Sequence, residues 1–417
     1  MNPIFDALWM GLISLARIIF HPIFWVVIFI VSSQHKKRME AEIKILGMTR
    51  RGLLHRTMDS IILGLAGGLI GSILMILIGV SLRQEGIIYI WPTAILLFMI
   101  KSRYLCFSYA GGLLSLLYLI FGFPSIDVPG LMALVAILHF IESFLIFFNG
   151  DQDGLPIVVD HGNGKHIGGY SLQGFWPIPV IILTLLMDYP VDPNSLIEMP
   201  DWWPIIKPMG IQDMEGVTFL MVSIVAALGY GDLALTQVPK RKARRSALRL
   251  GIYSVILLIL SIISSRTPIV QWVAALFAPI AHELLIIWGR KEEEEGQAIF
   301  TFPQRGVRVL DVLEGSASHR LNIGRGDIIY SINNIPVDSE RDLRQILDQQ
   351  PTFVWIEGEK LSGEKFTKEL KAYPYGLRTL GVLLLPEYSK ITYVMKEKDG
   401  ILKSFLNRIA SKGNPPD

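Results

Sequence analysis

Residues 307–337 read VRVLDVLEGSASHRLNIGRGDIIYSINNIPV, and this stretch decides the fold of the C-terminal part of the chain. The alternation over 307–310 predicts a strand. Residues 317–321 fit a short helix, and a glycine-containing loop leads to a second predicted strand at 328–332. The stretch therefore predicts a small α+β domain.

The sequence that follows completes this pattern. Asn333-Asn334 suits a hairpin turn, because asparagine tolerates positive φ. Asp338 or Ser339 can cap a helix whose apolar residues recur three and four positions apart. The further predicted elements are that helix, over 339–349, and strands at 353–356 and 364–370.

Three short motifs give this region a resemblance to the bacterial PDZ domains of high-temperature-requirement proteases. They are Val312-Leu313 with Ser316-Ala317, Gly324-Arg325-Gly326-Asp327-Ile328-Ile329, and Ile332-Asn333. The resemblance implies a partly open β-barrel with two helices. It also implies a groove that binds an extended peptide by adding it to a sheet edge.

Two loops are candidates for binding the carboxylate of such a peptide. Leu380-Gly381-Val382 matches the apolar-Gly-apolar pattern of PDZ domains and follows the core, whereas Gln304–Val307 precedes it. We favour the first loop, with a plain closing strand as its alternative. Leu343 and Leu347 either line the opposite wall of the groove or only fill the core.

The rest of the chain has a different composition. Of 417 residues, 51% are apolar and 18% are charged, and the charge deficit lies in the first 290 residues. Soluble chains carry about 25% charged residues, so one large soluble enzyme is excluded. The predicted units are a polytopic membrane domain (1–290), an acidic solvated linker (291–300), a PDZ domain (301–386) and a tail (387–417).

Apolar runs predict a multi-span α-helical membrane domain of about eight or nine spans. A span needs about 20 residues, and the three runs of only 13–15 residues are alternatively re-entrant or tilted. Pro22 interrupts the first run, so an interfacial helix followed by a span from Pro22 is an alternative to one long helix. The runs are 7–32, 60–82, 87–100, 104–122, 129–148, 175–187, 217–236, 251–265 and 268–288.

Loop charges predict which side of the membrane each loop faces. The stretches 33–58 and 237–250 are rich in Lys and Arg, whereas 188–215 is acidic. By the positive-inside rule the first two are cytoplasmic, and so is the C-terminal domain. The stretch 33–58 either lies on an anionic membrane surface or is a solvated connector. The N-terminus lacks a basic n-region and a cleavage site, so we expect the first segment to be retained.

Two further features of the membrane part carry expectations. The pairs Gly64/Gly68 and Gly67/Gly71 permit close helix contact, either within the chain or in a homodimer. The single cysteine, Cys106, excludes disulfides within the chain and cysteine-based zinc or iron–sulfur sites, and is expected to be a buried inert thiol.

Ionisable residues within apolar spans are candidates for function. His139, Glu142, His282 and Glu283 form the expected intramembrane polar cluster. It is either a hydrogen-bonded structural group or a metal or proton site, and His282 and Glu283 alternatively reach the membrane interface. His282-Glu283 before a PDZ-like domain resembles site-2-type intramembrane metalloproteases, whose His-Glu-x-x-His motif binds zinc. The second histidine is missing here, so we expect no enzyme, no metal ligand and no cofactor.

The whole layout resembles the MinJ family of cell-division topology proteins of Gram-positive rods. Short stretches carry the resemblance: His21-Pro22, Leu138–Ser143, Phe175–Pro179 and Ala278–Glu283. It implies a membrane scaffold that bridges a polar and septal protein and the ATPase MinD, at septa and poles. We expect protein partners, the lipid bilayer, self-association and no nucleic acid. The alternatives are a divergent intramembrane protease and a membrane transporter.

Overall fold

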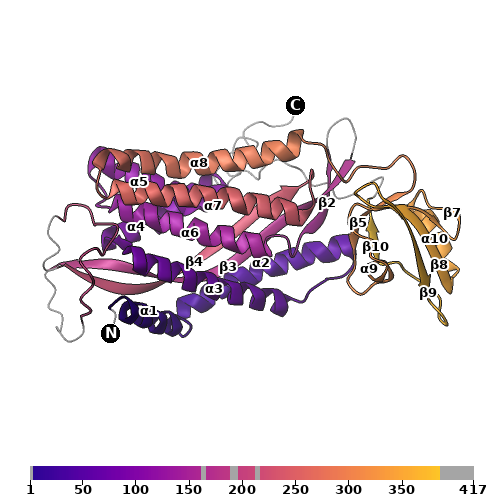
Figure 1. Cartoon of the computed structure of the whole chain (residues 1–417), viewed down its shortest axis with the longest axis horizontal. Coiled ribbons are helices and arrows are strands. Elements are labelled where there is room, and N and C mark those ends of the chain that lie inside the picture. Colours follow the sequence, from indigo (N-terminus) through magenta and orange to yellow (C-terminus); the bar gives the residue numbers. More distant parts are fainter. Residues whose placement is uncertain (1–2, 161–165, 188–195, 212–216, 386–417) are drawn as a thin grey trace, which may run out of the picture.

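The computed structural model consists of a bundle of helices and long strands, followed by a smaller β-rich domain at one end (Figure 1). The structure describes residues 3–160, 166–187, 196–211 and 217–385. The bundle contains helices α1 Pro3–Ile18, α2 Pro22–Leu46, α3 Leu53–Ile78, α4 Gln84–Ile100, α5 Phe107–Phe121, α6 Val128–Asn149, α7 Pro239–Ser264 and α8 Pro268–Glu295, and the 3-10 turn η1 Ser102–Leu105. Its strands are β1 Ser81–Leu82, β2 Leu155–Asp160, β3 His166–Met187 and β4 Val217–Ala234.

Four described helices, α3, α6, α7 and α8, are long and apolar enough to cross a membrane. Helices α1 and α2 pass the same test only as a pair, bent by 64°, and would add a fifth span. The bend falls at Pro22, where the sequence analysis placed a break. These helices indicate a membrane-associated domain with fewer helical spans than the eight or nine expected.

Two of the expected helical spans, 175–187 and 217–236, are wrong: both segments are strands. β3 pairs antiparallel with β4 from Tyr170 opposite Ala234 to Met187 opposite Val217. Hydropathy measures apolar length and does not distinguish a buried strand from a helix. Pro177 and Pro179, two residues apart, disfavour a helix and are tolerated at a strand edge that lacks a ladder partner.

The edge of β3 that carries these prolines lies against α3. A Cβ on Gly64 would lie 2.1 Å from the Pro177 oxygen, and one on Gly68 would lie 2.0 Å from the Pro179 oxygen. The next donor along this edge, the Ile181 N–H, donates to Ser72 Oγ at 3.0 Å. The glycines therefore serve packing within the chain, and the prolines remove donors that an apolar environment would leave unpaired.

Helices α4 and α5 form a hairpin that does not cross the bundle. Arg83 and Ser125 flank its two ends and are hydrogen-bonded at 2.9 Å. Its tip at Cys106 lies 3.0 Å from His139, in the middle of α6. The two ends are thus on one side, so the expected full spans at 87–100 and 104–122 are wrong. The re-entrant alternative that was given for the short run 87–100 agrees with this arrangement.

The C-terminal domain, described over residues 301–385, has a six-stranded sheet and two helices. The path through the sheet is β10-β5-β6-β8-β9, and β7 pairs with β6. Its core is a cluster of buried aliphatic side chains from the sheet and α10. The elements are β5 Val307–Val312, α9 Ala317–Arg320, β6 Ile328–Ile332, β7 Ile335–Pro336, α10 Glu340–Asp348, β8 Phe353–Glu359, β9 Lys365–Lys371 and β10 Val382–Leu384.

Candidate functional site

The loop at Leu380-Gly381-Val382 leads into an edge strand. β10 pairs antiparallel with β5, and its other edge is not paired within the described sheet. The ladder uses Gly381 O, which accepts from the Leu313 N–H, and the Leu385 N–H, which donates to Arg308 O. Because bonding direction alternates along a strand, Val382 and Leu384 direct their N–H groups to the free edge.

Gly381 has backbone geometry that requires glycine. Its φ is +72°, and an added Cβ would lie 2.3 Å from Ser316 Cβ. Its N–H donates to Thr379 Oγ1 at 3.1 Å. The loop is thus held closely against the start of α9.

Helix α10 contributes to the same domain core as this strand. Leu343 and Leu347 are each only 6% exposed and belong to the same apolar cluster as Leu380 and Leu384. The structure therefore places both leucines in the core. Helix α10 begins with a capping box, in which the Ser339 hydroxyl and the Asp342 carboxylate cap each other's backbone N–H. The hydrogen bond from Ser339 lowers the pKa of Asp342.

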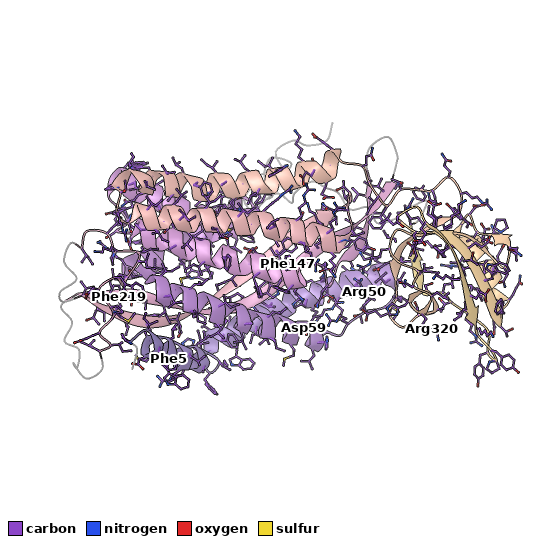
Figure 2. The ribbon with its side chains drawn as sticks, viewed as in Figure 1. Phe5, Arg50, Asp59, Phe147, Phe219 and Arg320 are labelled. Atoms are coloured by element: carbon purple, nitrogen blue, oxygen red, sulfur yellow. The ribbon has the colours of Figure 1, made fainter. Side chains whose placement is uncertain are left out.

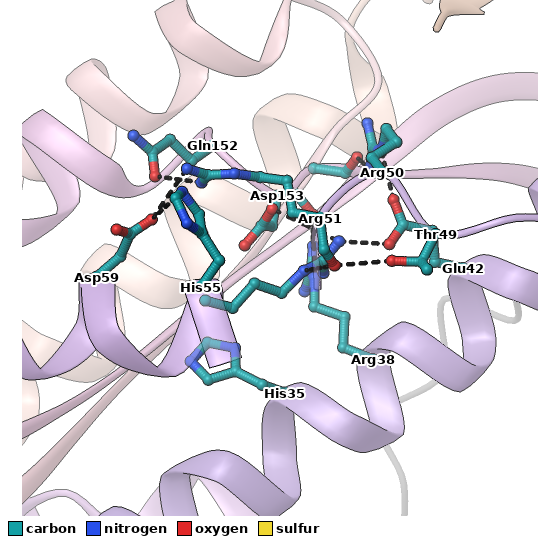
Figure 3. A network of polar contacts seen from close by, with 12 residues as sticks. His35, Arg38, Glu42, Thr49, Arg50, Arg51, His55, Asp59, Gln152 and Asp153 are labelled. Atoms are coloured by element: carbon teal, nitrogen blue, oxygen red, sulfur yellow. Dashed lines mark hydrogen bonds and ion pairs between the residues drawn. The ribbon is translucent and has the colours of Figure 1, made fainter. Parts of the chain in front are cut away.

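A buried network of charges lies where the C-terminal domain meets the bundle. Figure 3 shows its centre, where Glu42 of α2 is bound by Arg50. Arg56 binds the same carboxylate. Arg50 also donates to Asp311 of β5 at 2.9 Å and to the Gly154 carbonyl at 2.8 Å. Figure 2 shows Arg50 at this junction, far from Phe5 and Phe219. Through Arg50, the basic stretch 33–58 thus packs against the C-terminal domain. The expectation that this stretch is a solvated connector is wrong.

Residues of β3 also make hydrogen bonds at the same junction. Tyr170 donates its hydroxyl proton to the Leu310 carbonyl, and Gly168 N–H donates to the Phe300 carbonyl at 2.8 Å. Arg325 pairs with Asp311 at 2.8 Å and stacks over the Tyr170 ring. We call the contacts around Glu42, Arg50 and Asp311, with those of Tyr170, the junction network.

The expected solvated linker at 291–300 is wrong for its first half. Residues up to Glu295 continue α8, and Glu293 is only 2% exposed. Its carboxylate accepts from the Leu235 N–H at 2.7 Å and lies 3.2 Å from Lys242 Nζ. This acidic run therefore fixes the end of α8 to the start of α7.

The intramembrane residues separate into two groups. His139 and His282 lie together, with His139 Nε2 at 3.0 Å and His282 Nε2 at 3.8 Å from Cys106 Sγ. Glu283 instead accepts from the Tyr109 hydroxyl at 2.6 Å and pairs with Arg103 at 2.6 Å. Glu142 has no hydrogen bond or ion pair with any residue that the structure describes.

Cys106 was not among the predicted site residues. The sequence-based exclusion holds for sites with several thiolates, and does not extend to a mixed set in which one sulfur joins two imidazoles. Cys106, His139 and His282 offer one ligand atom each, and these atoms lie within 4.8 Å of one another. The sequence alone does not indicate this contact, because the three residues come from α6, α8 and the turn before α5.

Fold and sites define a membrane-associated helical protein with a docked β-rich domain. No family model matches the chain. It is 22% identical over 385 residues to the cell division topological determinant MinJ of Bacillus subtilis (strain 168), which covers 88% of this chain and 93% of that protein.

Two further curated relatives cover a smaller part. They are the probable cell division topological determinants MinJ of Lacticaseibacillus paracasei and Lacticaseibacillus casei (strain BD-II), each 22% identical over 198 residues. These matches span 45% of this chain and 53% of each relative. The chain is thus MinJ-like, as a distant relative.

Proposed function

We propose that the chain is a membrane-anchored scaffold that acts in division-site placement. The observation that carries the proposal is the similarity to a cell division topological determinant over most of both chains. The architecture supports it, because membrane-associated helices carry a docked domain whose strand β10 has an edge that no described strand pairs with. As a finer proposal, the scaffold bridges a polar and septal protein and MinD.

We further propose that residues 301–386 form a PDZ domain, with Leu380-Gly381-Val382 as the carboxylate-binding loop. A peptide would add to the free edge of β10 through the outward N–H groups of Val382 and Leu384. Support comes from the left-handed Gly381, which brings the loop close to α9, and from the adjoining α10.

The distribution of charge supports a cytoplasmic location for this domain. The end of α2 and the start of α7 lie at the end of the bundle that carries the domain, whereas the start of α1 and the segment 196–211 lie at the other end (Figure 1). Basic loops face the cytoplasm by the positive-inside rule. We therefore propose that the junction network lies on the cytoplasmic side.

The test is the position of a fluorescent protein fused after Asp417 and expressed from the native promoter in growing cells. We expect enrichment at septa and poles. A second multi-pass membrane protein with the same fusion, expressed at the same level, is the control for membrane crowding at septa. An even distribution that matches this control contradicts the proposal.

A further inference from the structure

Cys106, His139 and His282 converge from three separate elements inside the bundle. Cys106 precedes α5, His139 is in α6, and His282 is in α8. His282 is about 21 Å along α8 from Pro268, at 1.5 Å per residue, and His139 lies in the middle of α6, so the group lies within the apolar part. His139 is only 3% exposed.

Hydrogen bonds fix the tautomer of both imidazoles. His139 Nδ1 lies 2.7 Å from the Val135 carbonyl, which only accepts, so Nδ1 carries the proton. The Tyr109 hydroxyl donates to Glu283, so its oxygen accepts from His282 Nδ1 at 3.4 Å. In each neutral ring the Nε2 lone pair is therefore free, and both point at the same sulfur.

One thiol cannot satisfy both of these lone pairs. Its single S–H donates to one Nε2 and leaves the other acceptor without a donor, which is costly in an apolar interior. A protonated imidazole paired with a thiolate would place two charges there instead. A metal cation satisfies all three atoms at once.

We propose that Cys106, His139 and His282 bind one zinc ion. Tetrahedral zinc with bonds of about 2.3 Å to sulfur and 2.0–2.1 Å to nitrogen places the sulfur about 3.5–3.6 Å from each nitrogen. The observed separations of 3.0 and 3.8 Å lie on either side of this range. The nitrogen–oxygen contacts of Nδ1 are the outer-shell bonds that orient histidine ligands.

Charge balance suggests the group at the fourth position. A zinc ion with one thiolate and two neutral imidazoles carries one positive charge. Glu142 is one helical turn from His139 in α6 but is not among the residues whose ligand atoms lie within 4.8 Å of one another. Its carboxylate would balance this charge through a water molecule at the fourth position.

The bound ion would hold the tip of the α4–α5 hairpin to α6 and α8. The hairpin enters and leaves on one side, so its tip is fixed only by contacts inside the bundle. Metal loading would therefore add to the contacts of Arg103 and Tyr109 with Glu283, which also hold this re-entrant element.

The test uses the full chain in detergent, purified with an affinity tag free of histidine. The protein is stripped with a chelator, reloaded with zinc, and analysed by elemental mass spectrometry. We expect one zinc per chain and near loss of it in Cys106→Ser and His282→Gln. His55→Gln, at an exposed histidine, is the matched control and should keep the metal.

Cobalt loading gives a readout that needs no variant. A thiolate ligand produces an intense near-ultraviolet charge-transfer band, which we expect in the wild-type chain. Tyr109→Phe removes the acceptor for His282 Nδ1 and should weaken zinc binding about 10–100-fold, whereas Tyr104→Phe should not. Absence of the cobalt band with substoichiometric zinc in the wild-type chain would overturn the proposal, as would equal zinc in Cys106→Ser.

Discussion

Arg50 Nη1 lies 2.9 Å from Asp311 Oδ2, and this contact joins residues 261 positions apart in the chain. Arg50 is 12% and Asp311 only 3% exposed at the side chain. Arg50 also binds Glu42, so one guanidinium connects α2 to the first strand of the C-terminal domain. The domain is thus attached to the bundle by buried charges as well as by the covalent chain.

Arg50→Ala should loosen the C-terminal domain from the bundle. Glu42 and Asp311 each lose one partner but stay bound to Arg56 and Arg325, so the cost should be about 1.5–3 kcal/mol, that of a hydrogen bond to a charged group. Hydrogen exchange of the β5 amides in the detergent-solubilised chain measures the opening free energy. Arg344→Ala, which breaks the exposed pair with Glu340, should cost at most about 1 kcal/mol. Equal effects of the two variants would contradict a structural role for the junction network.

A double-mutant cycle isolates the contact itself. Arg50→Ala and Asp311→Ala should be non-additive, with a coupling energy of about 0.5–3 kcal/mol, because the two side chains touch. Additive effects would show that each residue acts through its other partners.

Gly68→Ala should destabilise the membrane domain. The new Cβ would meet the Pro179 carbonyl at 2.0 Å, so α3 and β3 must separate. Overpacking of this kind costs about 1–3 kcal/mol, which a lowered thermal midpoint of the purified chain would report. The matched control is Gly52→Ala at the N-cap of α3, where nothing lies within 4 Å of the added Cβ.

Gly381→Ala should weaken peptide capture. The added Cβ would meet Ser316, so the loop must move away from its place beside β10. Loss of one hydrogen bond to a charged carboxylate is worth about 1.5–3 kcal/mol, or at least a tenfold change in Kd. The measurement is the affinity of the full chain for a peptide selected from a library of free C-termini.

Gly315→Ala is the control for this prediction. Gly315 has the same left-handed backbone, with φ of +74°, but nothing lies within 4 Å of its added Cβ. The Gly315→Ala variant should have the same backbone strain as Gly381→Ala and keep the wild-type affinity for the peptide. The amidated form of the peptide should bind weakly to the wild-type chain. Similar affinities for both variants would contradict the groove assignment.

Asp127, between α5 and α6, should make stability depend on pH. Burial raises the pKa of its carboxyl from 3.8 to about 7, against smaller opposing effects of the Met209 N–H and of Arg83. Between these values the folded chain keeps a proton that the unfolded chain has released. Stability should therefore fall as pH rises through this window, by on the order of 4 kcal/mol in total.

Asp127→Asn provides the comparison. Its amide oxygen can still accept from the Met209 N–H, as Asp127 Oδ1 does at 3.1 Å. Between about pH 4 and 7, the thermal midpoint of this variant should depend less steeply on pH, because the contribution of Asp127 is removed. Identical slopes for the wild-type chain and the variant would show that the carboxyl titrates normally.

Much of the C-terminal domain could be read from the sequence. The strand predicted at 328–332 is β6, and the helix predicted over 339–349 is α10 with its Ser339 cap. These elements are local: alternation, helical spacing and caps are set by neighbours in sequence. The glycine pairs of α3 were likewise explained by packing within the chain.

The membrane part was harder to predict, because hydropathy carries no information on backbone conformation. Pro177 and Pro179 were the available signal that β3 is extended. The junction network could not be found this way, since Arg50 and Asp311 have no periodic relation. The same holds for Cys106 and His282, which meet only because the hairpin turns back inside the bundle.

The β3–β4 ladder is a continuous hydrogen-bonded ribbon within the bundle. At one end Leu183 pairs with Ser81, beside the loops opposite the C-terminal domain. At the other end Tyr170 holds the carbonyl of Leu310 in β5. A hydrogen-bonded ribbon resists stretching more than a chain of separate helices joined by loops. A force applied at one face of the bundle would therefore reach the C-terminal domain as a displacement rather than being absorbed between the ends.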